Sequence, residues 1–560
     1  MCGIIGGNKF KNDTKIQQGL LSIIHRGKDD NTIFSFDNNM YLSHNRLSIQ
    51  DLSEVANQPM VSDDSRYYLA FNGELWKSSF DKFDKKLRKL YNFKTEKSDT
   101  ELLLYYLIHN IKNIGRSLRE LDGMFAFSLY DSETKTTYLG RDFIGRMPLY
   151  YHYDGEKFGY CSEAKGLRVG LDTPYYKIDV KSKYHKMADV KDKETIYPVL
   201  PGHLITFEPH PFVTDSYEIK EEVWYTFKDE YDKDNQSYYT RDEEQFRHFE
   251  QEDKGVDYYV NGFKDIVNEA VDNELISDVP VCTILSGGID STIITYLLSK
   301  KLKNVEAFVV NVNPLRKSKY KDDLYYARMA AKEFGIKLHE VNVDREDIEK
   351  KLKESIWASE TFKWTQVSPA VAQLFLAEEI EKQGYKVVFG GEGADEIFAS
   401  YGDVKRFCWN EPVHWHQKRI NLLNGLHKSN LVRTNKSMMY GGTVELRTPF
   451  LNKEVIDFGL RIPTKYRDEN YEVRKNFEYK TTEHSDGNVM KFILRKAFEN
   501  DISEELLWRP KKTFQVGCHT DYLKTEEPMM YKVFGELFVK GNGYTEYLSK
   551  SDKKINLEKK

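Results

Sequence analysis

A short apolar run that ends in two glycines, within residues 281–292 (VCTILSGGIDST), constrains the fold of this 560-residue chain more than any other stretch. An apolar run of strand length, ended by glycines and followed by an apolar helical pattern, predicts a buried parallel strand, a tight turn and a helix N-terminus. Backbone N–H groups at the start of such a helix, together with the positive end of its dipole, bind anions. The stretch therefore predicts a phosphate site.

The residue types of this loop indicate which class of phosphate ligand it binds. Glycines allow a phosphate to approach the backbone, hydroxyls donate hydrogen bonds, and an aspartate suits a phosphate that a metal ion neutralises. The spacing matches neither the common Gly-Lys-Ser/Thr phosphate loop nor the Gly-x-Gly-x-x-Gly dinucleotide turn. It resembles the pyrophosphate loop of ATP pyrophosphatases, which adenylate an acid and release pyrophosphate; a Gly-rich turn with incidental hydroxyls is the alternative. The candidate ATP-binding positions of the loop are Ser286, Gly287, Gly288, Asp290, Ser291 and Thr292.

Length and composition indicate a soluble protein of two or more domains. A chain of 560 residues exceeds single-domain size, and 40% hydrophobic with 31% charged residues is ordinary for a soluble protein. The formal net charge of -5 gives no sign of nucleic-acid binding. No apolar stretch approaches the roughly 18 residues of a membrane span. The five cysteines, which are scattered without metal-type spacing, favour a reducing, cytoplasmic location without membrane attachment.

The N-terminus carries a second candidate site at Cys2. Removal of Met1 would leave Cys2 with both a thiol and a free α-amine. An α-amine with a pKa of about 7.7–8.0 can act as the base for a thiol with a pKa of about 8.5. A cysteine after the initiator Met is also commonly a buried thiol without function, so its position alone leaves both interpretations open.

An ordered set of downstream motifs favours the nucleophile. Together with residues 1–3 (MCG), this set resembles the glutaminase domain of class II glutamine amidotransferases, which use an N-terminal nucleophile. The resemblance implies an α-β-β-α sandwich for the first half. The motifs are residues 25–27 (HRG), 44–51 (HNRLSIQD), 71–74 (FNGE), 98–101 (SDTE), 121–126 (LDGMFA), 140–145 (GRDFIG) and 161–163 (CSE).

The resemblance also implies a role for each residue of this site. Cys2 would attack the side-chain amide of glutamine, while the Asn72 amide and the Gly73 N–H would stabilise the tetrahedral oxyanion. Arg46 would bind the α-carboxylate and Asp99 the α-ammonium; a surface ion pair is the alternative for these two. The rest of the glutamine pocket would consist of Leu47, Ser48, Ile49, Gln50 and Glu74.

In the second half, strand and helix patterns alternate. Residues 305–312 read as a strand and 322–335 as a helix, so the pattern after the phosphate loop predicts a doubly wound parallel sheet. Ligands of such sheets lie at the carboxyl ends of the strands. By the ATP-pyrophosphatase resemblance, Leu285 and Val310 lie where the adenine ring packs.

A second Gly-rich strand end, within residues 386–397 (KVVFGGEGADEI), carries further acidic residues. On local grounds a solvated loop is the alternative, but the stretch resembles the Ser-Gly-Glu-Gly-Ser-Asp-Glu motif of asparagine synthetases. By that match Gly390 and Gly391 contact the nucleotide and Glu392 supports acyl-adenylate formation or the attack on it. Asp395 would share a Mg²⁺ ion with Asp290, because two carboxylates beside a pyrophosphate require a metal.

Two later motifs, residues 433–451 and 491–495, resemble further synthetase motifs. They supply Arg433, Lys436 and Lys491, the cations expected to balance the phosphates and the developing charge at the adenylated carbonyl. The resemblance thus covers residues 1 to about 525, and the chain is identified as a member of the glutamine-hydrolysing asparagine synthetase family. We expect a glutaminase domain at 1–210, a polar linker at 211–255, a synthetase domain at 256–545 and a charged tail at 546–560.

The chain departs from the family mainly where the acceptor acid should bind. Residues 360–369 (ETFKWTQVSP) lack the arginine that the family has there, and an arginine is the natural partner of the α-carboxylate of aspartate. The substrates expected are glutamine, ATP with Mg²⁺, and aspartate. Amidation of a different carboxylate and a catalytically silent binding relative are the alternatives, and a homodimer is left open.

Overall fold

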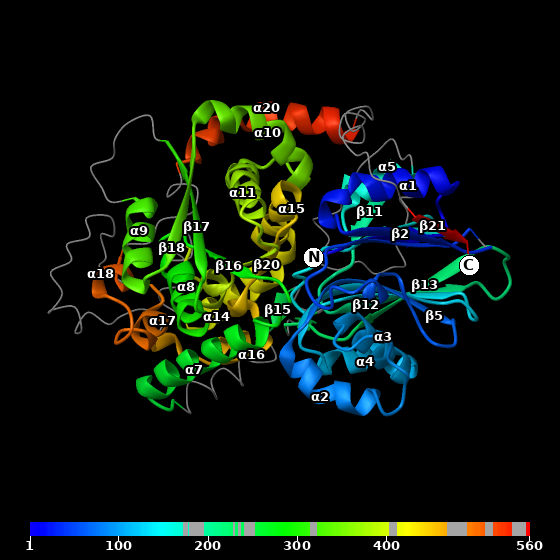
Figure 1. Cartoon of the computed structure of the whole chain (residues 1–560), viewed down its shortest axis with the longest axis horizontal. Coiled ribbons are helices and arrows are strands. Elements are labelled where there is room, and N and C mark those ends of the chain that lie inside the picture. The colour runs from blue at the N-terminus through cyan, green and yellow to red at the C-terminus, as the bar shows by residue number, and fades with distance from the viewer. Residues whose placement is uncertain are drawn as a thin grey trace.

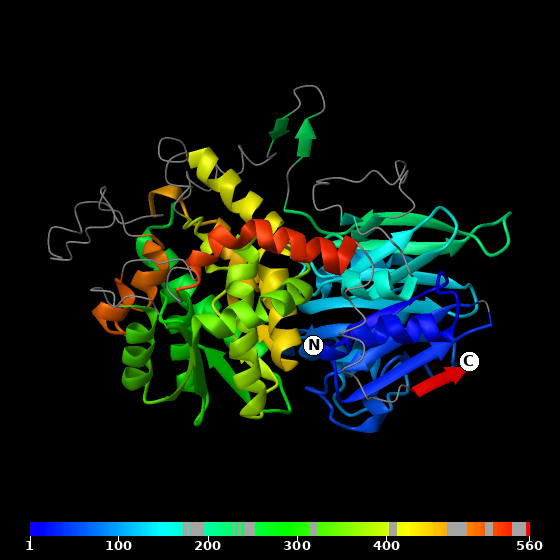
Figure 2. The same ribbon diagram turned by 90° about the horizontal axis from the view of Figure 1, so that it is seen from above.

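The chain forms two bodies that lie side by side, the first half mostly blue to cyan and the second half green through yellow to red (Figure 1). The view from above shows the same division (Figure 2). Within the described part of the chain, no helix combines the length and apolar character needed to cross a membrane. The computed structural model describes residues 1–37, 39–171, 195–227, 253–313, 322–401, 412–466, 490–509 and 519–539, with the backbone of short strands at 177–178, 230–232, 237–239 and 556–559.

The first half consists of two mainly antiparallel sheets between two layers of helices, so the α-β-β-α sandwich is confirmed (Figure 1). One sheet has the order β10 (Lys177–Ile178), β11 (Thr195–Pro198), β8 (Tyr150–Tyr153), β9 (Phe158–Cys161), β1 (Gly3–Gly7), β3 (Tyr41–Arg46), β2 (Asp30–Ser35), β21 (Asn556–Lys559). The other has the order β13 (Tyr217–Val223), β12 (His203–Pro209), β7 (Thr136–Arg141), β6 (Gly123–Asp131), β5 (Tyr67–Leu75), β4 (Met60–Val61). The outer helices are α1 (Asp13–Ser22) and α5 (Ala164–Leu171) on the first sheet, and α2 (Lys77–Leu87), α3 (Asp99–His109) and α4 (Ile114–Ser117) on the side of the second.

Residues 217–223 were expected in the polar linker, but they form strand β13 at the edge of the second sheet, in register with β12. The pattern reads as polar because the strand is an edge strand, with Tyr217 buried and charged residues facing solvent. Trp224 and Phe227 are buried directly after it. Residues 228–252, the most charged part of the expected linker, lie outside the described residues apart from the β14 (Glu230–Asp232) and β15 (Ser237–Tyr239) backbones.

The second half is built on a five-stranded parallel sheet, as the alternation of strands and helices predicts. Its order is β18 (Lys337–Val343), β17 (Glu306–Val312), β16 (Val281–Ile284), β19 (Val387–Phe389), β20 (Glu445–Arg447). Helices α8 (Ile289–Lys301) and α9 (Asp323–Phe334) lie on one side of it, and α10 (Arg345–Ser359), α11 (Trp364–Lys382) and α15 (Asn430–Gly442) on the other (Figure 1). The remaining helices include α7 (Val256–Glu274), α12 (Ala394–Ile397), α14 (Pro412–Gly425), α16 (Lys453–Leu460), α17 (Phe492–Ala497), α18 (Glu504–Leu507) and α20 (Glu527–Phe534).

The strand order reverses at β16, which lies between β17 and the much later β19. The carboxyl ends of β16 and β19 therefore meet, and a crevice at such a reversal is the usual ligand site of an open parallel sheet. Glycines permit the loops to approach. Gly287 has φ +75°, and a Cβ there would lie 2.5 Å from the Asp323 carbonyl oxygen. A Cβ on Gly391 would lie 2.6 Å from the Ser291 nitrogen, so the two Gly-rich loops are in direct contact.

Candidate functional site

The first site lies around Cys2, just before β1. The Cys2 nitrogen donates to Asn72 Oδ1 at 2.9 Å. The sulfur lies between the backbone groups of Leu47, 3.5 Å from its nitrogen and 3.8 Å from its oxygen. Arg26 Nε donates to the Cys2 carbonyl at 2.9 Å. Strands β1, β3 and β5 thus bring together residues that the sequence separates by up to 70 positions.

Burial controls the reactivity of this thiol. Cys2 is 6% exposed, and burial raises its pKa to about 11, against smaller lowering effects of the N-terminal amine and the Leu47 backbone. The thiol is therefore protonated at neutral pH, and its attack requires a nearby base. The Asn72 Nδ2 amide, which is also buried, has no hydrogen-bond partner among the described residues. A buried, uncommitted N–H donor beside a nucleophile can stabilise an oxyanion.

Two carboxylates predicted to bind glutamine, Asp99 and Glu74, are buried in the first half. Burial raises the pKa of Asp99 to about 7, although the Leu75 N–H donates to its carboxylate at 3.1 Å. Burial, followed by repulsion from Glu445 and Asp99, raises the pKa of Glu74 well above its ordinary value, and Gln50 Nε2 donates to that carboxylate. A buried carboxyl with a raised pKa gains from an added cation, so this pocket favours a substrate ammonium.

Arg46 is not part of a surface ion pair. It is buried, and its guanidinium donates to the backbone oxygens of Ser53 and Asp51 and to the side chain of Asn57. Within the described parts of the chain no carboxylate pairs with Arg46. Its charge is therefore available to a substrate carboxylate. Ser48 and Ile49, also predicted for this pocket, are buried beside it.

The second site is a cavity of about 460 Å³ at the carboxyl ends of β16 and β19. Its volume lies within the roughly 300–1,000 Å³ of small-molecule sites. The structure brings into its wall most of the residues predicted for the nucleotide, the metal and the transferred group. These are Ser286, Gly288, Asp290, Ser291, Gly390, Gly391, Glu392, Asp395, Arg433 and Lys491.

Lys491 joins two predicted carboxylates in this cavity. Its Nζ donates to Asp290 Oδ1 and Oδ2 at 2.7 and 2.6 Å, and it lies 2.6 Å from Asp395 Oδ1. The lysine is 1% exposed, and although burial lowers its pKa, the two aspartates outweigh this and raise it. The carboxylates of Asp290 and Asp395 therefore converge on one position, which the Lys491 ammonium occupies.

The donor set at this point fits Mg²⁺. Carboxylate oxygens are hard ligands, and Mg²⁺ is commonly held by one or two of them together with substrate phosphates. Across the described residues no cluster of three or more His, Cys, Asp or Glu could hold a metal ion. Asp290 and Asp395 would thus hold the ion only together with the phosphates of a nucleotide.

Glu392 and Arg433 face the same cavity from different elements. Burial raises the pKa of Glu392, with a smaller opposing effect of Arg433, and its Oε2 has no hydrogen-bond partner among the described residues. Arg433 donates to Asn430 Oδ1 at 3.1 Å and to Thr434 Oγ1 at 3.0 Å. A carboxyl of raised pKa beside a guanidinium is typical of a catalytic cavity.

Some predicted residues lie outside the cavity wall. The side chains of Leu285, Thr292 and Val310 are buried in the packing around the sheet, and Gly287 serves the turn of the loop. Their predicted contact with the nucleotide stays a prediction.

The expectation that Lys436 balances the phosphates is wrong. The ammonium of Lys436 is buried between the two halves, where it pairs with Glu360 and donates to the Tyr150 hydroxyl at 3.0 Å. A buried ammonium requires such a partner, and Glu360 supplies it.

The cavity also contains residues that motif matching missed. Arg509 donates to the Gly287 carbonyl, and its Nη2 lies 2.6 Å from Asp323 Oδ1. It therefore fixes the backbone of the Gly-rich loop to the start of α9. Gln366 and Gln373 line the cavity from α11. Their spacing of seven residues, two helical turns, was the available signal.

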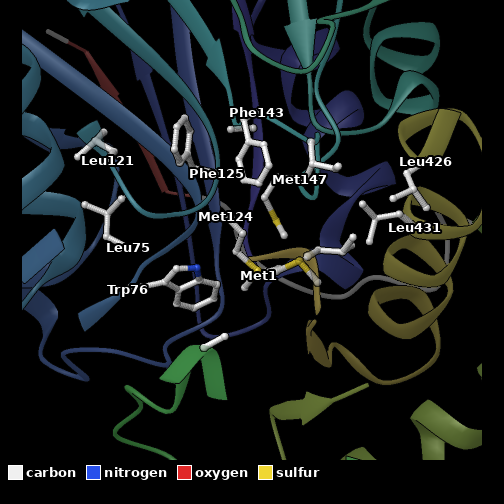
Figure 3. Packing of buried hydrophobic residues seen from close by; sticks show 14 of the residues in the cluster. Met1, Leu75, Trp76, Leu121, Met124, Phe125, Phe143, Met147, Leu426 and Leu431 are labelled. Carbon is white, nitrogen blue, oxygen red and sulfur yellow. The ribbon is translucent and has the colours of Figure 1, made fainter. Parts of the chain in front are cut away.

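Apolar side chains of Met1, Met147, Leu426 and Leu431 lie where the two halves meet, and we call this group the apolar seam. Figure 3 shows Met1 between residues of the first half, such as Met147, and Leu426 and Leu431 of the second. Leu426 and Leu431 also line the second cavity. The Met1 nitrogen lies 3.2 Å from Glu445 Oε2, and both groups are fully buried. The first residue of the chain therefore touches both halves.

Both halves are similar to known protein families. Residues 1–218 match the glutamine amidotransferase domain family, and residues 262–416 and 409–544 match the asparagine synthase family. The chain is 28% identical to asparagine synthetase B [glutamine-hydrolyzing] of Escherichia coli over 544 residues, which cover 94% of this chain and 84% of that protein. It is 29% and 28% identical to the glutamine-hydrolyzing asparagine synthetases of Pongo abelii and Homo sapiens, over 541 residues that cover 92% of this chain and 84% of each relative.

Proposed function

This chain belongs to the asparagine synthase family, with a glutamine amidotransferase domain in its first half, and we propose that it amidates a carboxylic acid with ammonia taken from glutamine. Family membership implies the use of glutamine and ATP. Aspartate is the acceptor we propose, with asparagine, glutamate, AMP and pyrophosphate as the products. The observation that carries the proposal is the pairing, in one chain, of a buried N-terminal thiol with a phosphate-loop cavity across an apolar seam.

In the first half, the thiol of Cys2 would attack the amide carbon of glutamine. Once Met1 is removed, the α-amine of Cys2 takes the thiol proton and returns it to the departing ammonia. Asn72 Nδ2 and the Gly73 N–H would stabilise the oxyanion. Arg46 and Asp99 would hold the charged end of glutamine, and water would then hydrolyse the thioester to glutamate.

In the second half, an oxygen of the acceptor carboxylate would attack the α-phosphorus of ATP, and pyrophosphate would leave. Ammonia would then attack the acyl carbon, and AMP would leave. Lys491 and Arg433 would stabilise the charge that develops on phosphate and carbonyl oxygens. Asp290 and Asp395 would hold Mg²⁺, which supplies neutralisation of phosphate charge when bound.

The apolar seam supports transfer of ammonia inside the protein. Protonation in water destroys the nucleophilicity of ammonia, so its route has to exclude water. Met147, Leu426 and Leu431 supply apolar surface between the two sites. A catalytically silent relative is a poorer account, because Cys2 lies beside Asn72 and Lys491 joins Asp290 to Asp395, which are the groupings that the two proposed reactions need.

The test incubates the protein with ATP, magnesium, glutamine labelled with ¹⁵N in its side-chain amide, and a panel of acids that includes aspartate. Mass analysis should find the label in asparagine. Cys2→Ala should abolish glutamine use and keep synthesis from ammonium salts, because it removes the nucleophile and leaves the second cavity intact. If the label appears in a different amide, the acid of that amide is the acceptor and aspartate is not. Loss of ammonia-dependent synthesis in Cys2→Ala would contradict the proposal that the two reactions occur at separate sites.

A further inference from the structure

One face of helix α11 forms part of the wall of the cavity. Gln366 and Gln373 lie two turns apart on this face, and seven residues of helix rise about 10 Å. Thr365, Pro369 and Leu376 complete the contribution of α11 to the cavity. This part of the wall therefore contains two carboxamides and no charged side chain.

The Gln373 carboxamide is fixed in place. The residue is 5% exposed, and its Nε2 donates to Thr434 Oγ1 at 3.1 Å. The same hydroxyl oxygen accepts a hydrogen bond from Arg433 Nη2 at 3.0 Å. Two hydrogen bonds thus connect Gln373 through Thr434 to Arg433, and they fix the orientation of the Gln373 carboxamide.

Within the described residues, the side-chain carbonyl oxygens of both glutamines lack a hydrogen-bond partner. Gln373 Oε1 and Gln366 Oε1 are each buried, and neither accepts a hydrogen bond within the part of the chain that the structure describes. A buried, unsatisfied acceptor is costly, so such a group in a ligand cavity indicates a donor on the ligand. Two acceptors on one wall therefore favour a ligand with several N–H groups.

This chemistry discriminates between acids. In an acceptor such as aspartate, the carboxyl that reacts is at one end, and an ammonium and a second carboxylate are at the other, far end. A carboxylate only accepts hydrogen bonds, so it cannot satisfy a glutamine carbonyl, whereas an ammonium or a carboxamide can. Of the cations that line the cavity, Lys491 pairs with the two aspartates and Arg509 with Asp323, while Arg433 and Arg495 donate to neutral oxygens. None of these cations lies on α11, so the part of the wall that α11 forms offers a carboxylate only neutral donors.

We propose that Gln366 and Gln373 bind the far end of the acceptor through its N–H donors, and that the far carboxylate is dispensable. The acceptors are then small acids with an ammonium or a carboxamide at the far end, including aspartate whose α-carboxyl is blocked as an amide. This inference rests on the proposed amidation, and it names the specificity-determining residues of that site.

Three acids test the inference on the unmodified protein. Aspartate has both groups at its far end, its α-amide isoasparagine has an ammonium and a carboxamide, and succinate has only a carboxylate. With ammonium salts as the nitrogen source, the rates of acid-dependent pyrophosphate release and of amide formation give kcat/KM for each acid. We expect isoasparagine within about tenfold of aspartate, and succinate at least about a hundredfold poorer, because it leaves both carbonyls unpaired.

Efficient use of aspartate and succinate, with rejection of isoasparagine, would overturn the inference, since the far carboxylate would then be the group recognised. Absence of pyrophosphate release with any acid would overturn the proposed amidation together with it. The two failures give different patterns across the panel.

Variants on α11 separate recognition from folding. Gln373→Leu should raise KM for the acceptor by about tenfold or more and leave KM for ATP and glutamine hydrolysis unchanged. Gln366→Arg should shift the preference toward aspartate over isoasparagine, because a guanidinium binds the far carboxylate. Gln383→Leu, at the exposed end of the same helix, is the matched control and should match the wild type. An unchanged acceptor preference in both cavity variants would overturn the role of the glutamines.

Discussion

At the scale of single residues, the charges of the second site lie where the motif order predicts, with one exception. Asp290, Asp395 and Lys491 come from three separated segments and meet within hydrogen-bond distance. Motif order identified them because each follows a strand or begins a helix at the same edge of the sheet. Lys436 was misplaced because the sequence does not show that Glu360 lies beside it. A residue type and its order in the chain predict a cluster, but they do not predict which ion pair a particular lysine joins.

Substitution of Asp290 or Asp395 by asparagine should reduce magnesium-dependent pyrophosphate release by about a hundredfold or more, while glutamine hydrolysis continues. The reason is that each change removes one of the two carboxylates that pair with the buried ammonium of Lys491 and that we propose to hold the metal ion. A coupled pyrophosphate assay and a glutamate assay on the same preparation measure the two reactions. Asp81→Asn, which breaks an exposed pair with Lys77, is the control and should change neither. Normal pyrophosphate release by both cavity variants would rule out the carboxylate pair as the metal site.

At the scale of secondary-structure elements, strongly patterned segments were predicted and edge or interface elements were not. The helix expected over 322–335 is α9, with Asp322 as its N-cap and Gly335 as its left-handed C-cap. The strand expected over 305–312 is β17. Strand β13 was assigned to the linker, because an edge strand with one solvated face has the polarity of a linker. The hydrophobic pattern of a segment indicates which of its faces is buried. It does not indicate which other segment packs against that face.

Helix α15 connects the two sites, since neighbouring residues on it face different halves. Arg433 lines the second cavity, while Asn435 Oδ1 accepts from Arg26 Nη1 and Nη2 at 3.3 Å. Arg26 in turn holds the Cys2 carbonyl. Asn435→Ala should therefore reduce glutamine-dependent synthesis more than ammonia-dependent synthesis, because it loosens the support of Cys2.

The two rates, measured on one preparation with saturating aspartate, give the ratio that tests this connection. The loss of a buried hydrogen-bond partner should also lower the free energy of unfolding by about 1–3 kcal/mol, which urea denaturation measures. Asn421→Ala, an exposed asparagine on α14, is the control. An equal fall in both rates would assign Asn435 to general stability alone.

At the scale of the whole molecule, the contacts that join the two halves are the part that the sequence could not reveal. Arg26 contacts Asn435 across 409 positions, and the N-terminal amine pairs with Glu445 of the second half. No local pattern encodes such pairs. The family resemblance predicted both halves, but not that Met1 itself lies in the apolar packing between them (Figure 3). The predicted limits of the two domains also stay a prediction, because buried residues of both halves belong to one hydrophobic cluster.

The buried N-terminus leads to the last prediction, which concerns residues placed before Met1. Met1 is 1% exposed, and its amine lies against Glu445, so an uncleaved N-terminal extension has no room and also removes the amine that the nucleophile needs. Such a protein should lose glutamine hydrolysis by about a thousandfold or more, and it should retain ammonia-dependent synthesis. Cleavage by a protease that leaves Cys2 as the first residue should restore glutamine use, and a glutamate assay before and after cleavage on one sample provides the internal control. If the uncleaved protein hydrolyses glutamine at the rate of the processed one, then neither a free α-amine nor an empty Met1 position is required for the attack by Cys2.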